Sequence, residues 1–455
     1  MSRRIWFLVG LLITTMFAVS ACDAVASPQP TIEAPEVFAT SIPVPTLTPE
    51  VEKEPSIDVQ PQNALADEVV KIQVLDLEPG QTITLTASMR DDRDRQWESY
   101  AVFRADSEGQ VDVAAQAPIT GTYSSVDPMG LIWSMLPNVP GTEYPYFANW
   151  ETYYVLVTIK AEANGELIAT GYMERIRLPQ NVEKTAVSEE GLVGTLFVPD
   201  GAGPYPTLLV LGGSDGGIDT TKAAMLAAHG YAALALDYFG QPPLPNELSE
   251  IPLEYFKTAI DWLKSQEVVD NEKIGVVGAS RGGELALLLG ATYPELKVVV
   301  GYMASGVVYA GYTSTGKPLR AAWTYEGEPI PFSPETDIDD ATIPVERING
   351  PILLISGADD QIWPSTELSE IAIARLQQYD HPYPFEHLVY ENGGHLIGVP
   401  YWPTVGDSFI HPVSHVQYTV GGTTEGNAHA SAGSWANVLA FLENNFKDDM
   451  PQIDQ

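Results

Sequence analysis

The chain has 455 residues, 45% of them hydrophobic and 18% charged, which is enough for two domains with a sizeable core. Its 23 basic and 60 acidic residues give a formal net charge of −37. This balance argues against nucleic acid as a partner, because phosphates need Lys and Arg to neutralise them, and against charge-driven docking on anionic membranes. The single cysteine excludes an intramolecular disulfide and a cysteine-based metal site.

The first residues predict export. Two arginines at positions 3 and 4 are followed by an apolar run from Ile5 to Phe17 and then by Val19-Ser-Ala-Cys22. This pattern is typical of a bacterial lipoprotein signal, in which cleavage precedes the cysteine and Cys22 carries the lipid. The alternatives are an ordinary secretory signal or an uncleaved anchor, although the run is short for a membrane span. We expect a signal peptide at 1–21 and an exported protein held on the membrane by its lipid anchor alone.

Residues 22–62 are rich in Pro, Thr, Ser and Glu and show no apolar period, which predicts a disordered linker. From about Val69 short segments alternate at period two, beginning with Lys71–Leu75 and Gln81–Thr86. Regular short strands separated by polar turns predict an immunoglobulin-like (Ig-like) β-sandwich over 63–182.

The pattern changes to alternating strands and helices over 183–455. This alternation predicts an α/β domain with a mostly parallel sheet and helices on both faces. The Pro- and Gly-rich excursion from Gly311 to Arg347 is expected to lie over the active site. Helices are expected at Thr220–His229, Pro252–Ser265, Ser365–Gln378 and Ser434–Phe446.

A candidate nucleophile lies between a strand and a helix of this domain. Ile274–Val277 reads as a short buried strand, Gly278-Ala-Ser280-Arg-Gly282 follows, and a helical pattern continues from Leu285. The glycines allow a sharp turn that exposes the Ser280 hydroxyl beside the first amides of the helix. A glycine-rich turn without chemistry is the alternative, but the flanking strand and helix favour a nucleophile elbow.

A serine nucleophile needs a base and a group that orients the base, and both are expected after later strands, with the acid first. We favour Asp360 over Asp359 as the acid, because Gly-x-x-Asp-x-x-x-Pro is the usual spacing of that loop. A plain acidic turn is the alternative. The base is expected to be His395, which stands in a Gly-Gly-His segment just past a predicted strand.

The other histidines give weaker indications of a functional role. His229 suits a helix C-terminus, and His387 begins a strand. His381, His411 and His415 lie in Pro-rich loops, and we interpret them as structural. A metal site built from them lacks tight ligand spacing, so no metal is expected.

The oxyanion of a serine mechanism needs backbone donors. One is expected from Arg281, just after the nucleophile. The second is expected from the amide of Ser214, with Gly213 as the alternative, in the Gly-rich loop that follows an early strand. A phosphate-cradling loop is disfavoured there because Gly-x-x-x-x-Gly-Lys is absent.

With these residues in place, the chain resembles the family of acyl-CoA thioesterases and bile acid-CoA:amino acid N-acyltransferases. The resemblance implies an α/β hydrolase preceded by a β-sandwich, with a catalytic triad of Ser280, Asp360 and His395, a small acyl thioester or ester as substrate, and no cofactor. It rests on Trp97–Asp106, Asp127–Met135, Leu211–Gly217, Ala235–Gly240, the elbow, Asp359-Asp360, Gly394-His395 and Gly421–Asn427.

The resemblance leaves the substrate open. Acyl transfer in this family is associated with a cysteine nucleophile, so Ser280 favours hydrolysis. Family members work on CoA thioesters inside cells, whereas this chain begins with an export signal. An extracytoplasmic carboxylesterase or peptidase-like hydrolase, an acyltransferase and a catalytically inactive binding lipoprotein are the alternatives to a thioesterase.

Overall fold

The computed structural model describes residues 53–138, 153–315, 319–404 and 408–446. They belong to one compact unit that runs from Lys53 to Gln455. The predicted signal peptide, the lipidation site Cys22 and most of the predicted linker lie outside the described residues. Within the described ranges, no helix is long and apolar enough to cross a membrane.

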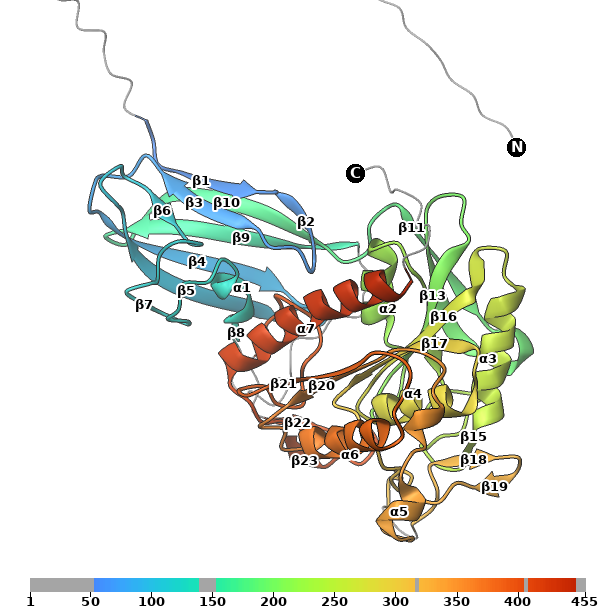
Figure 1. Ribbon diagram of the computed structural model, residues 1–455. Helices are drawn as coiled ribbons and strands as arrows, with labels where there is room; N and C mark the ends of the chain where they lie inside the picture. The colour runs from blue at the N-terminus through green and yellow to red at the C-terminus, as the bar shows by residue number, and fades with distance from the viewer. Residues whose placement is uncertain (1–52, 139–152, 316–318, 405–407, 447–455) are drawn as a thin grey trace, which may run out of the picture. The chain divides into compact units, whose positions relative to one another are not determined.

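The first part of the unit is a β-sandwich (Figure 1). Strand β4 shows why these residues form it, since Ile83, Leu85, Ala87 and Met89 are buried and alternate with polar neighbours. The two sheets approach closely at Gly171, where a β-carbon would lie 2.7 Å from Ile57. The smaller sheet has the order β1-β3-β6, and the larger has the order β2-β10-β9-β4-β5-β7 with β8 beside β5. The strands are β1 (Ser56–Gln60), β2 (Asn63–Leu65), β3 (Lys71–Leu75), β4 (Thr82–Arg90), β5 (Gln96–Arg104), β6 (Val111–Asp112), β7 (Thr120–Gly121), β8 (Leu136–Pro137), β9 (Tyr154–Ala163) and β10 (Glu166–Ile176), with helix α1 (Gly130–Trp133).

The second part is an α/β-hydrolase fold built on an eight-stranded sheet of order β11-β12-β14-β13-β16-β17-β20-β21. The pairs β11–β12 and β12–β14 are antiparallel, and the remaining neighbours are parallel. The strands are β11 (Val182–Val187), β12 (Val193–Pro199), β13 (Tyr205–Leu211), β14 (Ala232–Asp237), β16 (Val269–Ala279), β17 (Leu296–Tyr302), β20 (Ile352–Gly357) and β21 (Phe385–Tyr390). The main helices are α2 (Thr220–Ala228), α3 (Leu253–Ser265), α4 (Arg281–Thr292), α6 (Ser365–Gln378) and α7 (Thr424–Asn445).

Helices cover both faces of this sheet, as the sequence predicts. Strand β13 is buried along its whole length, which is typical of a strand with helices on either side. Leu208 and Val210 belong to a core shared with α2 and α7, whereas Leu209 and Leu211 belong to a second core shared with α3, α4 and α6. The C-terminal ends of the parallel strands therefore lie together at one edge, where the predicted catalytic residues follow them.

Only part of the described excursion between β17 and β20 lies at the active site. Gly311, Tyr312, Ser333 and Pro334 line the pocket described below. Its middle instead forms a small sheet with a strand that precedes α3. The excursion contains β18 (Trp323–Tyr325), β19 (Glu328–Pro329), α5 (Ile338–Ala341) and the 3₁₀ turn η2 (Val345–Arg347), and its partner strand is β15 (Ile251–Pro252).

Two predicted boundaries differ from the structure. The linker was expected to reach residue 62, but Ser56–Gln60 forms β1 and pairs with β3, because Ile57 and Val59 alternate with polar residues between two prolines. The last helix was expected from Ser434, but α7 begins at Thr424, where the Thr423 side chain accepts a hydrogen bond from the amide of Gly426. Its first turns are rich in small and polar residues, so no apolar period reveals them.

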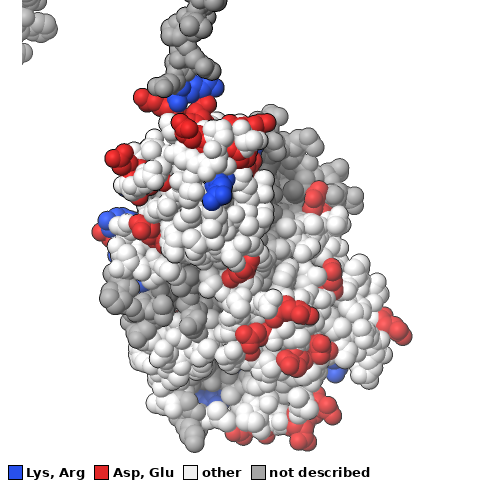
Figure 2. Space-filling model, turned by 90° about the vertical axis from the view of Figure 1, so that its left-hand side faces the viewer, with Lys and Arg blue, Asp and Glu red and all other residues white. Residues whose placement is uncertain are grey.

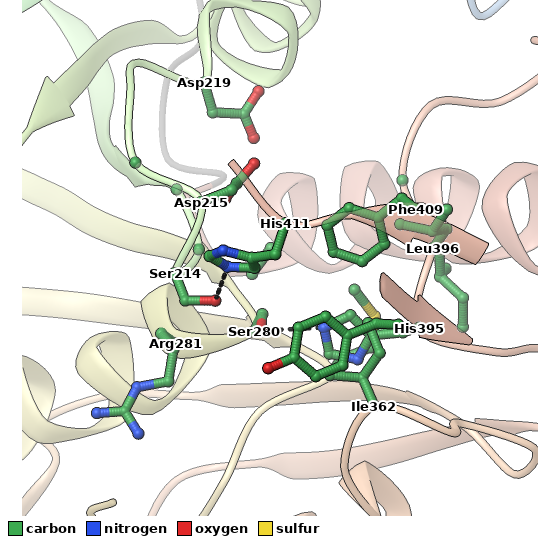
Figure 3. Close-up of a pocket in the computed structure, with 18 of the residues that line it drawn as sticks. Ser214, Asp215, Asp219, Ser280, Arg281, Ile362, His395, Leu396, Phe409 and His411 are labelled. Atoms are coloured by element: carbon green, nitrogen blue, oxygen red, sulfur yellow. Dashed lines mark hydrogen bonds between the residues drawn. The ribbon is translucent and has the colours of Figure 1, made fainter. Parts of the chain in front are cut away.

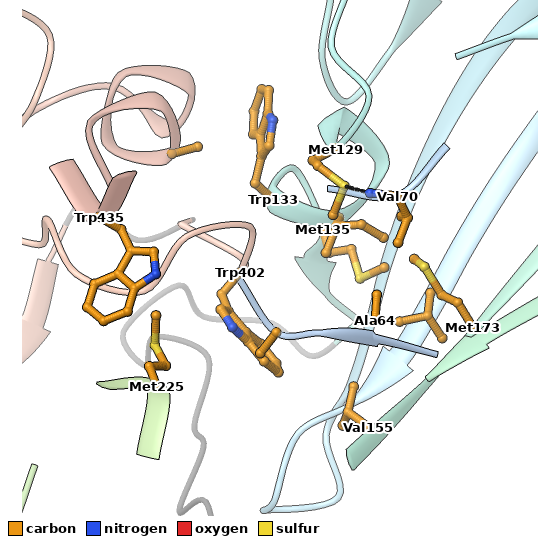
Figure 4. Packing of buried hydrophobic residues seen from close by; sticks show 14 of the residues in the cluster. Ala64, Val70, Met129, Trp133, Met135, Val155, Met173, Met225, Trp402 and Trp435 are labelled. Carbon is orange, nitrogen blue, oxygen red and sulfur yellow. Dashed lines mark hydrogen bonds between the residues drawn. The ribbon is translucent and has the colours of Figure 1, made fainter. Parts of the chain in front are cut away.

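The sandwich and the α/β part share one hydrophobic core (Figure 4). Met225, Trp402 and Trp435 of the α/β part meet sandwich residues such as Met129 and Met135 in this core. The guanidinium of sandwich residue Arg177 lies 5.1 Å from the Trp402 ring. Because each part contributes large apolar side chains, neither closes its core alone.

Two aspartates of the sandwich bind histidine and tryptophan side chains around this shared core. Asp67 accepts hydrogen bonds from His229 Nε2 and Trp435 Nε1 of the α/β part, each at 2.6 Å. Asp127 accepts from Trp133 Nε1 of its own domain at 2.9 Å and from His429 Nε2 of α7 at 2.8 Å.

Candidate active site

The predicted nucleophile stands at a strained turn between β16 and α4. Ser280 has φ 56° and ψ −120°, a backbone conformation that places its side chain at the tip of the turn. Glycine is required at both flanking positions, because a side chain there would clash with the backbone. A β-carbon at Gly278 would lie 1.9 Å from the carbonyl oxygen of Gly282, and one at Gly282 would lie 2.3 Å from that of Gly212. Ser280 therefore sits at the N-terminus of α4, where backbone amides lack helical partners.

The structure brings Asp360 and His395 to Ser280. His395 Nε2 lies 3.0 Å from Ser280 Oγ, and His395 Nδ1 lies 2.8 Å from Asp360 Oδ2. Asp360 follows β20 and His395 follows β21, so both come from the C-terminal edge of the sheet. The Asp360 side chain is 1% exposed, and its other oxygen accepts from the amides of Ile362 and Trp363 at 3.0 and 3.3 Å.

These partners fix the direction of each hydrogen bond. An ionised carboxylate only accepts, so Asp360 holds the proton on Nδ1 of His395. Nε2 is then unprotonated and can accept a hydrogen bond from the Ser280 hydroxyl. Asp359 does not reach His395. It is exposed and accepts from Gln361 Nε2 at 3.1 Å and the amide of Gly422 at 2.8 Å, bonds that hold its pKa below the usual value.

The loop predicted to supply oxyanion donors lies against the nucleophile. A β-carbon at Gly213 would lie 3.4 Å from the β-carbon of Ser280. Tyr238 Oη fixes the loop by donating to the carbonyl of Gly212 at 2.6 Å. Gly213, Ser214 and Arg281 all line one pocket with Ser280.

That pocket has a volume of about 820 Å³ (Figure 3). Apolar side chains of α2, α7 and the loop after β21 form one part of its wall, among them Met225, Val399, Trp402 and Trp435. Aromatic side chains form another part, among them Tyr309, Tyr312, Trp363, Phe409 and Tyr418.

The pocket wall also contains charged side chains to which the sequence analysis assigned no role. Burial and the neighbouring Asp219 raise the pKa of Asp215. Burial lowers the pKa of Lys222, whose ammonium lies 4.0 Å from the ring of Tyr302. Arg281 pairs with Glu284 at 3.1 Å and donates to the carbonyl of Tyr309 at 3.0 Å. No sequence motif reveals Lys222, since it belongs to an ordinary helical stretch.

His411, which the sequence places in a Pro-rich loop and which we interpreted as structural, lies at the pocket wall. His411 follows β22 (Ser408–Ile410) and precedes β23 (Gln417–Thr419), and it lines the pocket. Its Nε2 lies 3.0 Å from Ser214 Oγ. The alternation of Phe409 and His411 before Tyr418 was the only signal of this hairpin, because a Pro-rich context hid the strands.

The remaining histidines are not among the residues that line the pocket. His387 Nε2 lies 2.8 Å from Ser356 Oγ within the sheet, and His381 Nε2 lies 3.2 Å from the carbonyl of Gly350. His229 and His429 bind the sandwich as described above. Among the described residues, no cluster of three or more His, Cys, Asp or Glu side chains could hold a metal ion.

Comparison with known proteins covers both parts of the chain. Residues 67–189 match the family model for the acyl-CoA thioester hydrolase/BAAT N-terminal region, and residues 251–322 and 330–448 match the corresponding C-terminal model. A mouse peroxisomal succinyl-coenzyme A thioesterase is 30% identical over 83% of this chain and 93% of its own length. Human acyl-coenzyme A thioesterase 1 is 29% identical with the same two coverages. Among solved structures, a puromycin-hydrolyzing peptidase of Mycobacterium tuberculosis matches with a TM-score of 0.42 and 13% identity over 85% of this chain and 67% of its own.

Proposed function

The chain belongs to the acyl-CoA thioester hydrolase/BAAT family and is an acyl-CoA thioesterase-like hydrolase, and we propose that it works through an acyl-enzyme formed on Ser280. The observation that carries this proposal is the hydrogen-bonded chain from Ser280 through His395 to Asp360 at the pocket wall. The carboxylate holds the imidazole in the tautomer that accepts a proton, which is the arrangement a weak serine nucleophile needs.

The first half of the reaction acylates the enzyme. Ser280 Oγ attacks the acyl carbonyl carbon while His395 Nε2 takes the hydroxyl proton, and Asp360 stabilises the resulting imidazolium. The negative charge on the acyl oxygen is stabilised by the amides of Arg281 and Ser214, with Gly213 as the alternative donor. The intermediate collapses, the bond to the leaving group breaks, and His395 donates its proton to the departing thiolate or alkoxide.

The second half releases the acid. Water loses a proton to His395 Nε2 and attacks the acyl carbon, and the ester to Ser280 then breaks as His395 returns the proton to the serine oxygen. No step requires a metal or a cofactor. A serine nucleophile is the family variant associated with hydrolysis, so water rather than an amino acid is the proposed acceptor.

Hydrolysis of simple oxygen esters is the second candidate function. A CoA leaving group carries phosphates, which favour Lys and Arg partners. Lys222 and Arg281 are the only Lys or Arg residues among the described residues that line the pocket. Arg281 already forms an ion pair with Glu284. Acidic side chains also predominate over basic ones on the face shown in Figure 2. These observations favour a substrate without a highly charged leaving group.

Export and lipid anchoring through Cys22 are also proposals. They are supported by the basic start, the apolar run and the position of the cysteine in the sequence. Mass spectrometry of the protein from a membrane fraction tests them. A lipid on Cys22 is expected, and its absence from the intact protein would contradict the anchor.

The serine mechanism is tested with a fluorophosphonate probe on the full chain in detergent. The wild-type protein should be labelled at Ser280, and the S280A variant should not be labelled. Labelling that persists in S280A, or none in the wild type, would contradict the mechanism. Matched acyl-CoA and p-nitrophenyl acyl esters then decide between the two candidate functions, because kcat/KM ranks the leaving groups directly.

A further inference from the structure

The pocket contains a second serine–histidine pair, which the proposed mechanism does not use. Ser214 Oγ lies 3.0 Å from His411 Nε2, although the two residues are 197 positions apart (Figure 3). Ser214 comes from the loop after β13 and His411 from the β22–β23 hairpin. Both residues line the same pocket as Ser280 and His395.

The other ring nitrogen decides which atom donates in this pair. His411 Nδ1 lies 3.2 Å from the amide of Val413 and 3.4 Å from that of Ser414, and it accepts from both. A neutral imidazole has one acceptor and one donor nitrogen, so the ring proton is on Nε2. Nε2 therefore donates to Ser214 Oγ. Burial, with a smaller contribution from His415, lowers the pKa of His411 to about 4, which keeps the ring neutral at ordinary pH.

This direction excludes Ser214 as a second nucleophile. A nitrogen that already donates to Ser214 Oγ cannot accept the serine proton. The Ser214 hydroxyl hydrogen is instead available for another acceptor, and His411 is the only hydrogen-bond partner of Ser214 Oγ within the described residues. A hydroxyl that accepts one hydrogen bond also becomes a stronger donor, because the bonds polarise each other.

The reacting centre lies beside the loop that carries this hydroxyl. The loop that carries Ser214 touches the nucleophile, since a β-carbon at the preceding Gly213 would lie 3.4 Å from the β-carbon of Ser280. An acyl carbonyl attacked by Ser280 puts its oxygen on the side of this loop, where the amide of Ser214 is already expected to donate. We propose that the Ser214 hydroxyl is an additional donor to the acyl oxygen as it becomes an oxyanion, and that His411 is the positioning residue that keeps this donor aimed.

The surroundings of His411 fit a positioning role. The ring of Tyr312 packs against the imidazole, with centroids 4.5 Å apart and the ring planes tilted by 43°. Tyr312 Oη in turn lies 2.8 Å from Ser414 Oγ and 2.5 Å from Tyr418 Oη. His411 itself is 3% exposed. The hairpin therefore holds the imidazole in one orientation, which a mobile surface histidine would not have.

The inference depends on the proposed serine mechanism, and a double-mutant cycle on the full chain tests it separately. We would measure kcat and KM for a p-nitrophenyl acyl ester with wild type, S214A, H411F and S214A/H411F. Loss of one oxyanion donor should lower kcat of S214A by about 10²-fold while KM changes little. H411F should lower kcat less than S214A does, since the Ser214 hydroxyl remains but is no longer held in one orientation by a hydrogen bond. The double variant should match S214A, because His411 acts only through Ser214.

A conservative variant and a labelling control complete the test. H411Q retains an N–H donor and should recover part of the activity that H411F loses. Fluorophosphonate labelling of Ser280 should remain stoichiometric in all five proteins, which shows that the triad and the fold are intact. The inference is overturned if S214A keeps kcat within about twofold of the wild type, or if H411F costs as much in the S214A background as alone. Absence of labelling in the wild type would overturn the serine mechanism and this inference together.

Discussion

The two serine–histidine pairs of the pocket have the same length and opposite polarity. Ser280 Oγ and Ser214 Oγ each lie 3.0 Å from a histidine Nε2. The difference lies on the far side of each ring, where Nδ1 of His395 meets a carboxylate and Nδ1 of His411 meets two backbone amides. An acceptor behind the ring makes Nε2 a base, and donors behind the ring make Nε2 a donor. The chemistry of such a pair is thus set by the partner that does not touch the serine.

Replacing each serine by alanine should show the largest contrast. S280A removes the nucleophile and should lower kcat by about 10⁶-fold, since loss of this serine alone disables the whole triad. S214A removes only a donor, so its expected loss is smaller by several orders of magnitude. Steady-state hydrolysis of a p-nitrophenyl acyl ester measures both. Comparable losses in the two variants would contradict the assignment of one nucleophile and one donor.

Changing the group behind His395 should reverse the polarity of the catalytic pair. D360N offers an amide in place of a carboxylate, so His395 can take the tautomer that His411 has, with its proton on Nε2. We expect kcat to fall by about 10⁴-fold for this reason. D359N is the matched control, because Asp359 lies next to Asp360 in the chain but is exposed and bonded elsewhere. If D359N loses more activity than D360N, the orienting acid is the other aspartate.

Disturbing the ring that supports His411 should have a moderate effect. Y312A removes the aromatic partner of the imidazole, and such pairs contribute about 0.5–1.5 kcal/mol, so kcat should fall by at most about tenfold. Y312F keeps the ring and loses only the hydroxyl bonds to Ser414 and Tyr418, so a smaller loss is expected. Equal losses in Y312F and Y312A would show that the hydroxyl bonds, and not the ring contact, support the pair.

The last expected effect concerns stability and pH and not the rate of the reaction. The pKa of His411 is lowered to about 4 by burial and by His415, whereas the unfolded chain has the ordinary value near 6.5. Between these values the unfolded state binds more protons than the folded state, so this group makes the free energy of unfolding fall as the pH drops from about 6.5 to about 4. Urea unfolding near pH 7 and near pH 5 measures the change. It should be smaller in H411F, and an equal change in both proteins would contradict a buried, neutral imidazole.

The sequence predicts most of the catalytic arrangement because local patterns encode it. The elbow around Ser280, the loop with Asp360 and the Gly-Gly-His segment of His395 each follow a predicted strand, and strand ends of a parallel sheet meet at one edge. The choice between Asp359 and Asp360 rested on loop spacing, and the geometry brings Asp360 to the base. The Ig-like topology of the sandwich remains a prediction.

The rest depends on contacts that no local pattern encodes. His411 reaches Ser214 across 197 residues, and its polarity comes from backbone amides of Val413 and Ser414, which carry no side-chain signature. The interactions of Asp67 with His229 and of Asp127 with His429 span 162 and 302 residues. The start of α7 was hidden because its small residues pack closely without an apolar period.

The shared core limits how this protein can be cut or recombined. A gene fragment that begins at residue 183 would leave Trp402, Trp435 and Met225 facing water and would remove both aspartates that bind His229 and His429. Grafting a different sandwich onto the α/β part would have to restore two carboxylates at matching positions as well as the apolar surface. The two halves of this chain therefore have to be engineered as a pair, even though separate family models match them.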